Sequence, residues 1–219
     1  FRYVDNENLG SVVASPGAGD VAQPAYSSLG PIVEYHSIDP SDELGGTVSV
    51  AFGDDKLRRS FIKLNTGKIG PMSAYISRTK LDSNLARGAG TIDREHAEAK
   101  VKFDLWDDAY VDFKWVYNDF YDFDSPSVTK SQYNLGTPCP NGEGGQYCGY
   151  SATLPPGTLG NVLEYNVPGY TYDTTGWSLD RLNVRTDQLY GSTFYTPLGP
   201  DASVSVTGYY ETKKGWGSS

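Results

Sequence analysis

The sequence contains no run of about 20 apolar residues, which is the length that a membrane-spanning helix requires. It has one methionine in 219 residues, and the long periodic patterns of amphipathic helices are missing. A helical membrane protein is therefore excluded, and a helical bundle is disfavoured. A chain of this length can form one large all-β domain, and a closed β-barrel is the remaining structure that spans a bilayer.

Basic residues are scarce: 18 Lys and Arg stand against 27 Asp and Glu, so the net charge is −9. No basic stripe with interleaved aromatic residues is present, and we expect no nucleic-acid partner. The sequence has two histidines and neither a Gly-x-Ser-x-Gly nor a His-Glu-x-x-His motif. We therefore expect neither an enzyme nor a cofactor.

Metal-ligand patterns are weak as well. Strand alternation places His96 and Glu98 on one face but supplies no third ligand, which predicts a solvated pair and no metal site. Asp119, Asp122 and Asp124 cluster near a strand end, but the glycine and glutamate of an EF-hand loop are missing. A calcium site at that strand end is the alternative left open.

The two cysteines, Cys139 and Cys148, lie in the segment TPCPNGEGGQYCGY, which is rich in glycine and proline. Two thiols this close in a polar loop predict a local disulfide formed in an oxidising compartment. Two unrelated free thiols are the alternative.

Alternation of apolar and polar residues dominates the chain after residue 45. It is clearest in HAEAKVKFDLWDDAYVDFKWVYNDF, where Val101, Phe103, Val111 and Phe113 face one way. A period of two residues over about twelve residues in each arm predicts a hairpin. The same pattern predicts seven strands in all. Residues 1–45 are rich in Gly, Ser, Pro and Asn and predict a loop-rich unit with one short β-like patch, PIVEYHSI.

The predicted connections are unequal. The short links TGKIG, WDDA and LGPD fall at one end of the sheet, and the longer ones fall at the other, where DDKL is a short exception. Short turns at one end and long loops at the other are typical of a membrane β-barrel. The outward faces are predicted to be uncharged throughout, as hydrocarbon requires, and the inward faces to be charged. A soluble secreted sandwich is the alternative for an alternating sheet.

The longest connection, residues 123–182, has no sustained periodicity and is rich in aromatic residues. Such loops are usually functional or disordered, and aromatic residues argue against plain disorder. Rigid amphipathic rings can capture a large polar ligand, or they can pack the loop on itself. The candidates for ligand binding are Tyr147, Tyr150, Tyr170, Tyr172 and Trp177.

Three runs in order, GGTVSVAFG, LRRSFIKLNTG and SAYIS, resemble the junction between plug and barrel in TonB-dependent outer-membrane receptors. The later run VRTDQLYGSTFYTPL is similar to a barrel strand of such receptors. The resemblance implies an all-β, antiparallel transmembrane segment of a plugged barrel of about 22 strands. It further implies that residues 1–45 are the tail of the plug and that residues 46–219 are the N-terminal part of the barrel.

The resemblance also implies a function: active uptake of a scarce nutrient, such as a ferric siderophore, vitamin or oligosaccharide, across the bacterial outer membrane. The implied partners are outer-membrane lipid, the TonB energy-coupling protein, the remainder of the receptor chain and a small-molecule or metal-chelate ligand. By analogy, Tyr26, Tyr35 and His36 are candidates for a ligand-facing plug apex. The alternatives are a soluble glycan-binding β-sandwich and a passive porin-like barrel.

Overall fold

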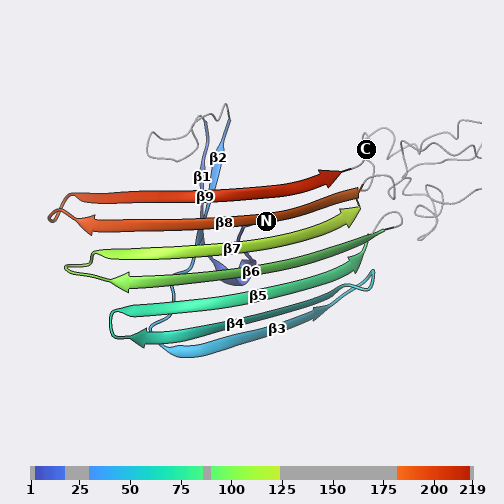
Figure 1. Cartoon of the computed structure of the whole chain (residues 1–219), viewed down its shortest axis with the longest axis horizontal. Helices are drawn as coiled ribbons and strands as arrows, with labels where there is room; N and C mark the ends of the chain where they lie inside the picture. Colours follow the sequence, from blue (N-terminus) through green and yellow to red (C-terminus); the bar gives the residue numbers. More distant parts are fainter. Residues whose placement is uncertain (1–2, 18–29, 86–89, 124–181, 218–219) are drawn as a thin grey trace, which may run out of the picture.

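The computed structural model describes residues 3–17, 30–85, 90–123 and 182–217. Within these residues the chain forms one curved antiparallel sheet of seven strands in consecutive order (Figure 1). The strands are β3 (Leu44–Phe52), β4 (Arg58–Ile69), β5 (Met72–Asn84), β6 (Thr91–Asp104), β7 (Tyr110–Phe123), β8 (Leu182–Pro197) and β9 (Ser203–Gly217).

This meander confirms the predicted all-β, antiparallel fold and the seven predicted strands. Most strands are longer than the usual five to six residues. For example, β6 and β7 each have 14 residues and β8 has 16. Strands of this length fit the span of a bilayer better than an ordinary soluble sheet. No helix in the described part of the chain is long and apolar enough to cross a membrane.

The two ends of the sheet differ as predicted. At the end we call the turn side, β4 joins β5, β6 joins β7 and β8 joins β9 through tight links (Figure 1). At the opposite end, the loop side, β7 joins β8 through the long segment 124–181, and β3 joins β4 through the short link at 53–57. The connection between β5 and β6, 85–90, is shorter than the predicted connector, because both strands extend into it. Asp107 and Asp108, in the link between β6 and β7, both have positive φ, as a tight hairpin turn requires.

One predicted turn is wrong. The glycines of TGKIG predicted a reversal of the chain at 66–70, but β4 continues to Ile69 and the reversal comes at Gly70 and Pro71. Gly67 instead forms a bulge between Asn65 and Lys68, where the register with β5 shifts. Its φ is +68°, and a Cβ there would lie 2.7 Å from the backbone nitrogen of Leu44. The glycine is therefore required for a bulge rather than for a turn.

The N-terminal region is more ordered than the sequence predicted. It contains a short 3₁₀ helix, η1 (Asn6–Asn8), followed by a two-stranded hairpin of β1 (Leu9–Ser15) and β2 (Ile32–Ser37). The β-like patch PIVEYHSI becomes β2, whereas β1 was not predicted, because LGSVVAS has little alternation. The hairpin runs across the sheet at a steep angle (Figure 1). A backbone hydrogen bond from Ile38 N to Asn8 O, 2.8 Å long, ties its ends together.

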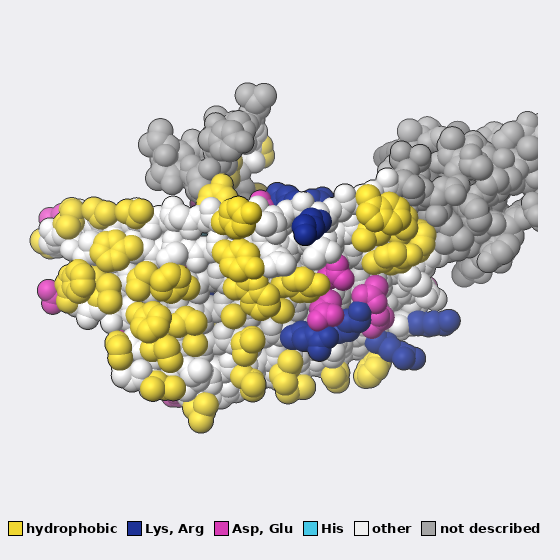
Figure 2. Space-filling model, in the orientation of Figure 1, with side chains coloured by type: hydrophobic (Ala, Val, Ile, Leu, Met, Phe, Trp, Pro, Cys, Tyr) yellow, Lys and Arg dark blue, Asp and Glu magenta, His cyan; other side chains and the backbone are white. Residues whose placement is uncertain are grey.

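The polarity of the two faces of the large sheet is the reverse of that in a water-soluble protein, where polar side chains are exposed and apolar ones are buried. The face that meets the N-terminal region, called the inner face below, buries polar residues, including His96, Glu98, Lys100 and Asn118. The outer face exposes large apolar side chains, so that Val48 is 74% and Phe113 51% exposed. Figure 2 shows this outer face, with hydrophobic side chains gathered toward the turn side. An exposed apolar patch of this kind marks a surface that meets lipid or a partner.

The outer face is nevertheless not uncharged throughout, which corrects a prediction. Its loop-side part carries a band of charged residues (Figure 2), namely Arg58, Arg78, Lys80, Asp82, Asp93, Glu95 and Asp119. The reason is strand length. A strand of 14 residues, rising roughly 3.3 Å per residue and tilted by about 40°, covers roughly 35 Å, whereas a barrel's apolar band is about 25 Å tall. Strands of this length are therefore longer than such a band, which leaves room for charged residues at one end.

Candidate functional site

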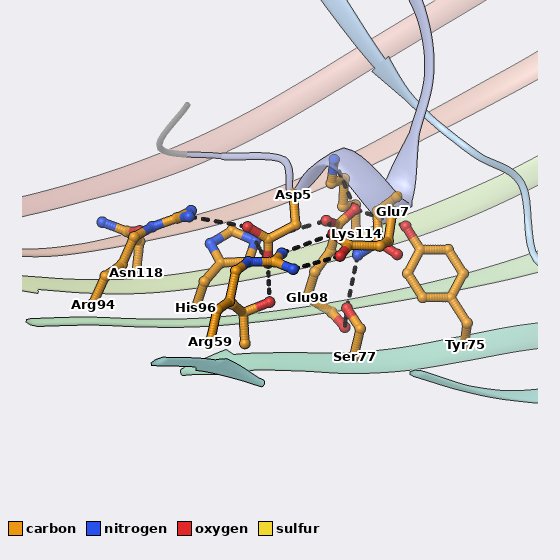
Figure 3. Close-up of polar contacts among 12 residues, drawn as sticks. Asp5, Glu7, Arg59, Tyr75, Ser77, Arg94, His96, Glu98, Lys114 and Asn118 are labelled. Carbon is orange, nitrogen blue, oxygen red and sulfur yellow. Dashed lines mark hydrogen bonds and ion pairs between the residues drawn. The ribbon is translucent and has the colours of Figure 1, made fainter. Parts of the chain in front are cut away.

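The most densely bonded site is the contact between η1 and the inner face (Figure 3). Three residues of the N-terminal segment take part, and they meet side chains from β4, β5, β6 and β7. We call this the anchor cluster; it comprises Asp5, Glu7, Asn8, Arg59, Tyr75, Ser77, Thr79, Arg94, His96, Glu98 and Lys114. Alternation places the sheet members on one face, because each lies an even number of residues from the next on its strand.

Asp5 is buried at one end of the cluster. Its Oδ1 accepts a hydrogen bond from Arg94 Nη1 at 3.0 Å, and its Oδ2 accepts one from the hydroxyl of Thr79. The side chain of Arg94 is 15% exposed and that of Asp5 is 3% exposed. A buried carboxylate needs such partners, since an unpaired one would cost several kcal/mol.

Glu7 lies on η1 and forms a two-pronged ion pair with Arg59 on β4. Arg59 Nη1 donates to Oε1 at 2.5 Å, and Nη2 donates to Oε2 at 2.8 Å. The hydrogen bonds from Arg59 hold the pKa of the Glu7 carboxyl below its usual value, against the opposing effect of burial. The ion pair therefore stays charged at neutral pH and holds η1 against β4.

Glu98 is the central acceptor of the cluster and is fully buried. The hydroxyl of Tyr75 donates to its Oε1 at 2.6 Å, and Lys114 Nζ lies 3.1 Å from the same oxygen. Asn8 donates from Nδ2 to Oε2 at 3.1 Å and to the hydroxyl of Ser77 at 2.7 Å. One carboxylate thus links three strands to η1 (Figure 3).

His96 corrects the expectation of a solvated pair with Glu98, because both side chains are fully buried beneath the N-terminal segment. His96 Nε2 is 3.8 Å from Glu98 Oε2 and 4.0 Å from Asp5 Oδ2. Within the described residues neither ring nitrogen has a hydrogen-bond partner. The same residues contain no group of three or more His, Cys, Asp or Glu side chains suited to a metal ion.

A second contact holds the connection between β2 and β3 to the same face. Asp39 accepts hydrogen bonds from Lys100 at 2.6 Å and from Lys102 at 3.0 Å. Burial raises the pKa of Asp39, but the bonds from the two lysines outweigh it, and the net shift is downward. Lys100 and Lys102 lie on the inner face, where the sequence predicted the charged side chains of the strands, and both contact the N-terminal region.

Tyr35 and His36, the described members of the predicted plug apex, line a cavity of about 780 Å³ between β2 and the inner face. Lys100, Lys114 and Tyr209 line it from the sheet. A volume of this size is typical of small-molecule sites. The cavity lies beside the anchor cluster and shares Lys114 with it.

The other predicted site residues lie outside the described residues. These are the candidate ligand-binding residues Tyr26, Tyr147, Tyr150, Tyr170, Tyr172 and Trp177, and the predicted disulfide partners Cys139 and Cys148. Their roles stay predictions.

Sequence reasoning missed Asp5, Glu7 and Asn8, because FRYVDNENLG has no periodicity that would point to a partner. One signal was available. The inward faces of the predicted strands carry Arg59 and several lysines, and buried cations need acidic partners from another part of the chain. Glu7 meets Arg59 and Asp5 meets Arg94 from the first ten positions, whereas Asp39 meets Lys100 and Lys102.

No family model and no curated protein matches the chain. Solved structures do match. The open form of the ferric-catecholate import receptor Fiu from Escherichia coli superposes with a TM-score of 0.65 at 14% identity. The siderophore receptor PiuA from Acinetobacter baumannii superposes with a TM-score of 0.66 at 15% identity. The chain shares its fold with part of these receptors.

The match covers 95% of this chain in both cases but 29% of Fiu and 26% of PiuA. The pyoverdine outer-membrane receptor FpvA from Pseudomonas aeruginosa, in its complex with pyoverdine, superposes with a TM-score of 0.55 at 16% identity. There the match covers 96% of this chain and 32% of the receptor. The chain therefore spans about a third or less of each receptor, and the observed sheet is a β-barrel segment in fold.

Proposed function

We propose that the chain is part of a TonB-dependent outer-membrane receptor that takes up a scarce nutrient actively. Residues 1–45 form the tail of the plug in this proposal, and residues 46–219 form the first strands of the barrel. The observation that carries it is the anchor cluster: a polar N-terminal segment is bonded to the inner face of strands whose outer face is apolar toward the turn side (Figure 2). The likeness to siderophore receptors supports the same assignment.

The chemistry of the anchor cluster suits a contact that opens. A permanent contact is usually apolar, because apolar burial needs no partner groups, whereas polar groups can exchange their partners for water when they separate. His96 adds to this, since its two buried ring nitrogens have no hydrogen-bond partner within the described residues. A force applied to the N-terminal segment would therefore break ion pairs such as Glu7–Arg59 rather than expose a hydrophobic core.

Substrate capture belongs to the loop at 123–182 and to the cavity lined by Tyr35 and His36. The aromatic loop residues Tyr147, Tyr150, Tyr170, Tyr172 and Trp177, together with Tyr26, are the proposed contacts for a small-molecule or metal-chelate ligand. The ferric siderophore is the favoured class of substrate, since the matching structures are named for siderophores. The energy would come from an inner-membrane complex through the TonB protein.

Disruption of the gene, combined with uptake assays for a labelled ferric siderophore, a vitamin and an oligosaccharide, tests this function. We expect uptake of one of them to fall to background, and to fall equally in the intact strain when the proton-motive force is collapsed. Uptake that persists without the proton-motive force would favour a passive porin instead. A chain that is monodisperse in buffer without detergent and absent from outer membranes would favour the soluble glycan-binding sandwich.

A further inference from the structure

The cavity of about 780 Å³ between β2 and the inner face reaches the turn side of the sheet. Tyr110, Thr193 and Ser205 line it, and each lies near the turn-side end of its strand. The long connection with the candidate aromatic residues leaves β7 and enters β8 at the opposite end of these strands. The cavity therefore lies at the other end of the strands from the points where that connection is attached.

The charges of the cavity lining are balanced. Besides His36, which is formally neutral at pH 7, the lining holds two carboxylates and two ammonium groups, those of Asp39, Asp112, Lys100 and Lys114. Lys100 Nζ is 2.6 Å from an oxygen of Asp39 and 3.5 Å from one of Asp112. Lys114 Nζ is 3.1 Å from Glu98 Oε1. Both ammonium groups of the described lining are thus already paired with carboxylates.

Hydroxyl groups line the side of the cavity formed by β8 and β9. Ser205, Thr207 and Tyr209 are spaced by two residues along β9, so they share its inner face. The hydroxyl of Thr193 on β8 lies 3.1 Å from that of Thr207. Each hydroxyl can donate one hydrogen bond and accept others. This wall therefore suits a ligand that carries many hydroxyl or carbonyl oxygens.

Open space and aromatic rings complete the cavity. Gly191 lies between its register partners Lys114 on β7 and Tyr209 on β9, and a Cβ added to it would meet no heavy atom within 4 Å. Tyr35 on β2 and Tyr209 are 39% and 65% exposed. A tyrosine ring packs against the C–H groups of a ligand while its hydroxyl forms a hydrogen bond. The cavity thus combines apolar and polar contacts in the way that small-molecule sites do.

We propose that this cavity binds an uncharged solute rich in hydroxyl or carbonyl oxygens and rejects a polyanionic one. A neutral ferric hydroxamate chelate and an oligosaccharide share this chemistry, whereas a ferric catecholate chelate carries several negative charges. A polyanion would meet the carboxylates of Asp39 and Asp112 with both lining ammonium groups already paired, and like charges at close range oppose binding. The proposal rests on the proposed function and narrows the class of substrate that the receptor takes up.

The test uses the chain purified from outer membranes in detergent and titrated in a calorimeter. The probes are ferrichrome, a neutral ferric trihydroxamate; maltohexaose, an uncharged oligosaccharide; and ferric enterobactin, a trianionic ferric catecholate. We expect at least one uncharged probe to bind, and ferric enterobactin to bind the cavity at least about tenfold more weakly. Binding of ferrichrome alone assigns the cavity to neutral chelates, binding of maltohexaose alone assigns it to oligosaccharides, and binding of both supports the shared chemistry.

Gly191→Leu identifies the binding that belongs to the cavity, because it places a side chain in the open space. It should weaken binding of the uncharged probe by about tenfold or more. Gly208→Leu is the matched control, since Gly208 lies on the outer face of β9 and a Cβ there also meets no heavy atom within 4 Å. Asp112→Asn should strengthen binding of ferric enterobactin about tenfold, because it removes a carboxylate from beside Lys100. Its amide oxygen can still accept the hydrogen bond from the backbone nitrogen of Thr193.

Weaker binding of an uncharged probe in Gly191→Leu, with Gly208→Leu unchanged, supports the cavity site. The site is overturned if neither uncharged probe binds, or if Gly191→Leu binds them as well as the parent chain does. Ferric enterobactin that binds the parent equally tightly and is lost in Gly191→Leu overturns the selection by charge, as does an Asp112→Asn variant that binds it no better. If the chain is absent from outer membranes, the proposed function fails. If energy-dependent uptake is present but insensitive to Gly191→Leu, only the cavity proposal fails.

Discussion

The inner and outer faces are built from the same strands and differ at every second residue. On β6, His96, Glu98 and Lys100 are buried on one side, while Ala97 and Val101 lie half-exposed on the other. In water this arrangement would be unstable, since apolar area is exposed and charge is buried. It becomes stable when hydrocarbon covers one face and a polar segment covers the other. The stability of the sheet therefore depends on the medium that covers each face as well as on the strand pattern.

A charge on the outer face should have the largest effect, because it prevents membrane assembly altogether rather than weakening a folded chain. Phe113→Lys places an ammonium group in the apolar rows near the turn side, where a lipid-facing lysine costs about 2–4 kcal/mol near the midplane. We expect the variant to be lost from the outer membrane, as measured by fractionation and by gel mobility with and without heating.

Thr193→Lys is the matched control for that variant. Thr193 lies on the inner face opposite Asp112, whose Oδ1 accepts a hydrogen bond from its backbone nitrogen at 3.1 Å. A lysine there meets a carboxylate and should be tolerated. Equal loss of both variants would mean that the solvents of the two faces have been assigned wrongly.

The next effect concerns the buried centre of the inner face. Glu98→Gln leaves Lys114 without its carboxylate, and breaking one side of a buried pair costs about 3–5 kcal/mol. Urea unfolding in detergent micelles measures the loss. The double variant Glu98→Gln/Lys114→Met should recover most of it, because it removes both charges and keeps an amide oxygen that can accept from Tyr75. A double variant as unstable as Glu98→Gln would refute the pairing.

A smaller effect is expected from acid. Glu7 and Asp39 both have pKa values lowered by their cationic partners. Their contribution to docking is therefore complete above the ordinary carboxyl pKa of about 4 and is lost as the pH falls through the lowered values. Residues 3–15 should stay docked between pH 7 and pH 5 and should be released below about pH 4.

Hydrogen exchange, corrected for its intrinsic pH dependence and followed by mass spectrometry, measures that release. Glu7→Gln is the informative variant, because it removes one of the two titrating groups and should already weaken protection of residues 3–15 at pH 7. Protection that falls between pH 7 and pH 5 in the parent chain would show that another group controls docking.

The sheet could be predicted from sequence because alternation is a local property. The alternation in segments such as 96–104 and 110–118 predicts which residues share a face, and the short links predict which strands pair. The bulge at Gly67 could not be predicted, since a glycine with positive φ serves a turn and a bulge equally well. Part of the charged loop-side band was missed because β5 and β6 extend beyond the predicted strands to include Lys80, Asp82 and Asp93. Asp119 was missed although it lies within the predicted hairpin.

The anchor cluster is harder to predict for a physical reason. Asp5 and Arg94 are 89 residues apart in the sequence, and the sequence around each residue gives no indication of its partner. Which residues form a long-range polar pair depends on the tertiary structure. Which residues form an apolar face depends only on the sequence of their own strand. The inward charges were predictable as a group, and their individual partners were not.

The smallest effects should separate two arginines on the paired strands β5 and β6. Arg94 points inward and donates to buried Asp5, whereas Arg78 points outward and donates to Glu95 from a side chain that is 61% exposed. Arg94→Gln should therefore cost about 1–3 kcal/mol, which is typical of a lost hydrogen bond to a charged group. Arg78→Gln should leave unfolding in urea unchanged within error, because water replaces an exposed pair. If both variants are equally stable, Asp5 is not held by Arg94, and the N-terminal segment is fixed to the sheet mainly through Glu7 and Asn8.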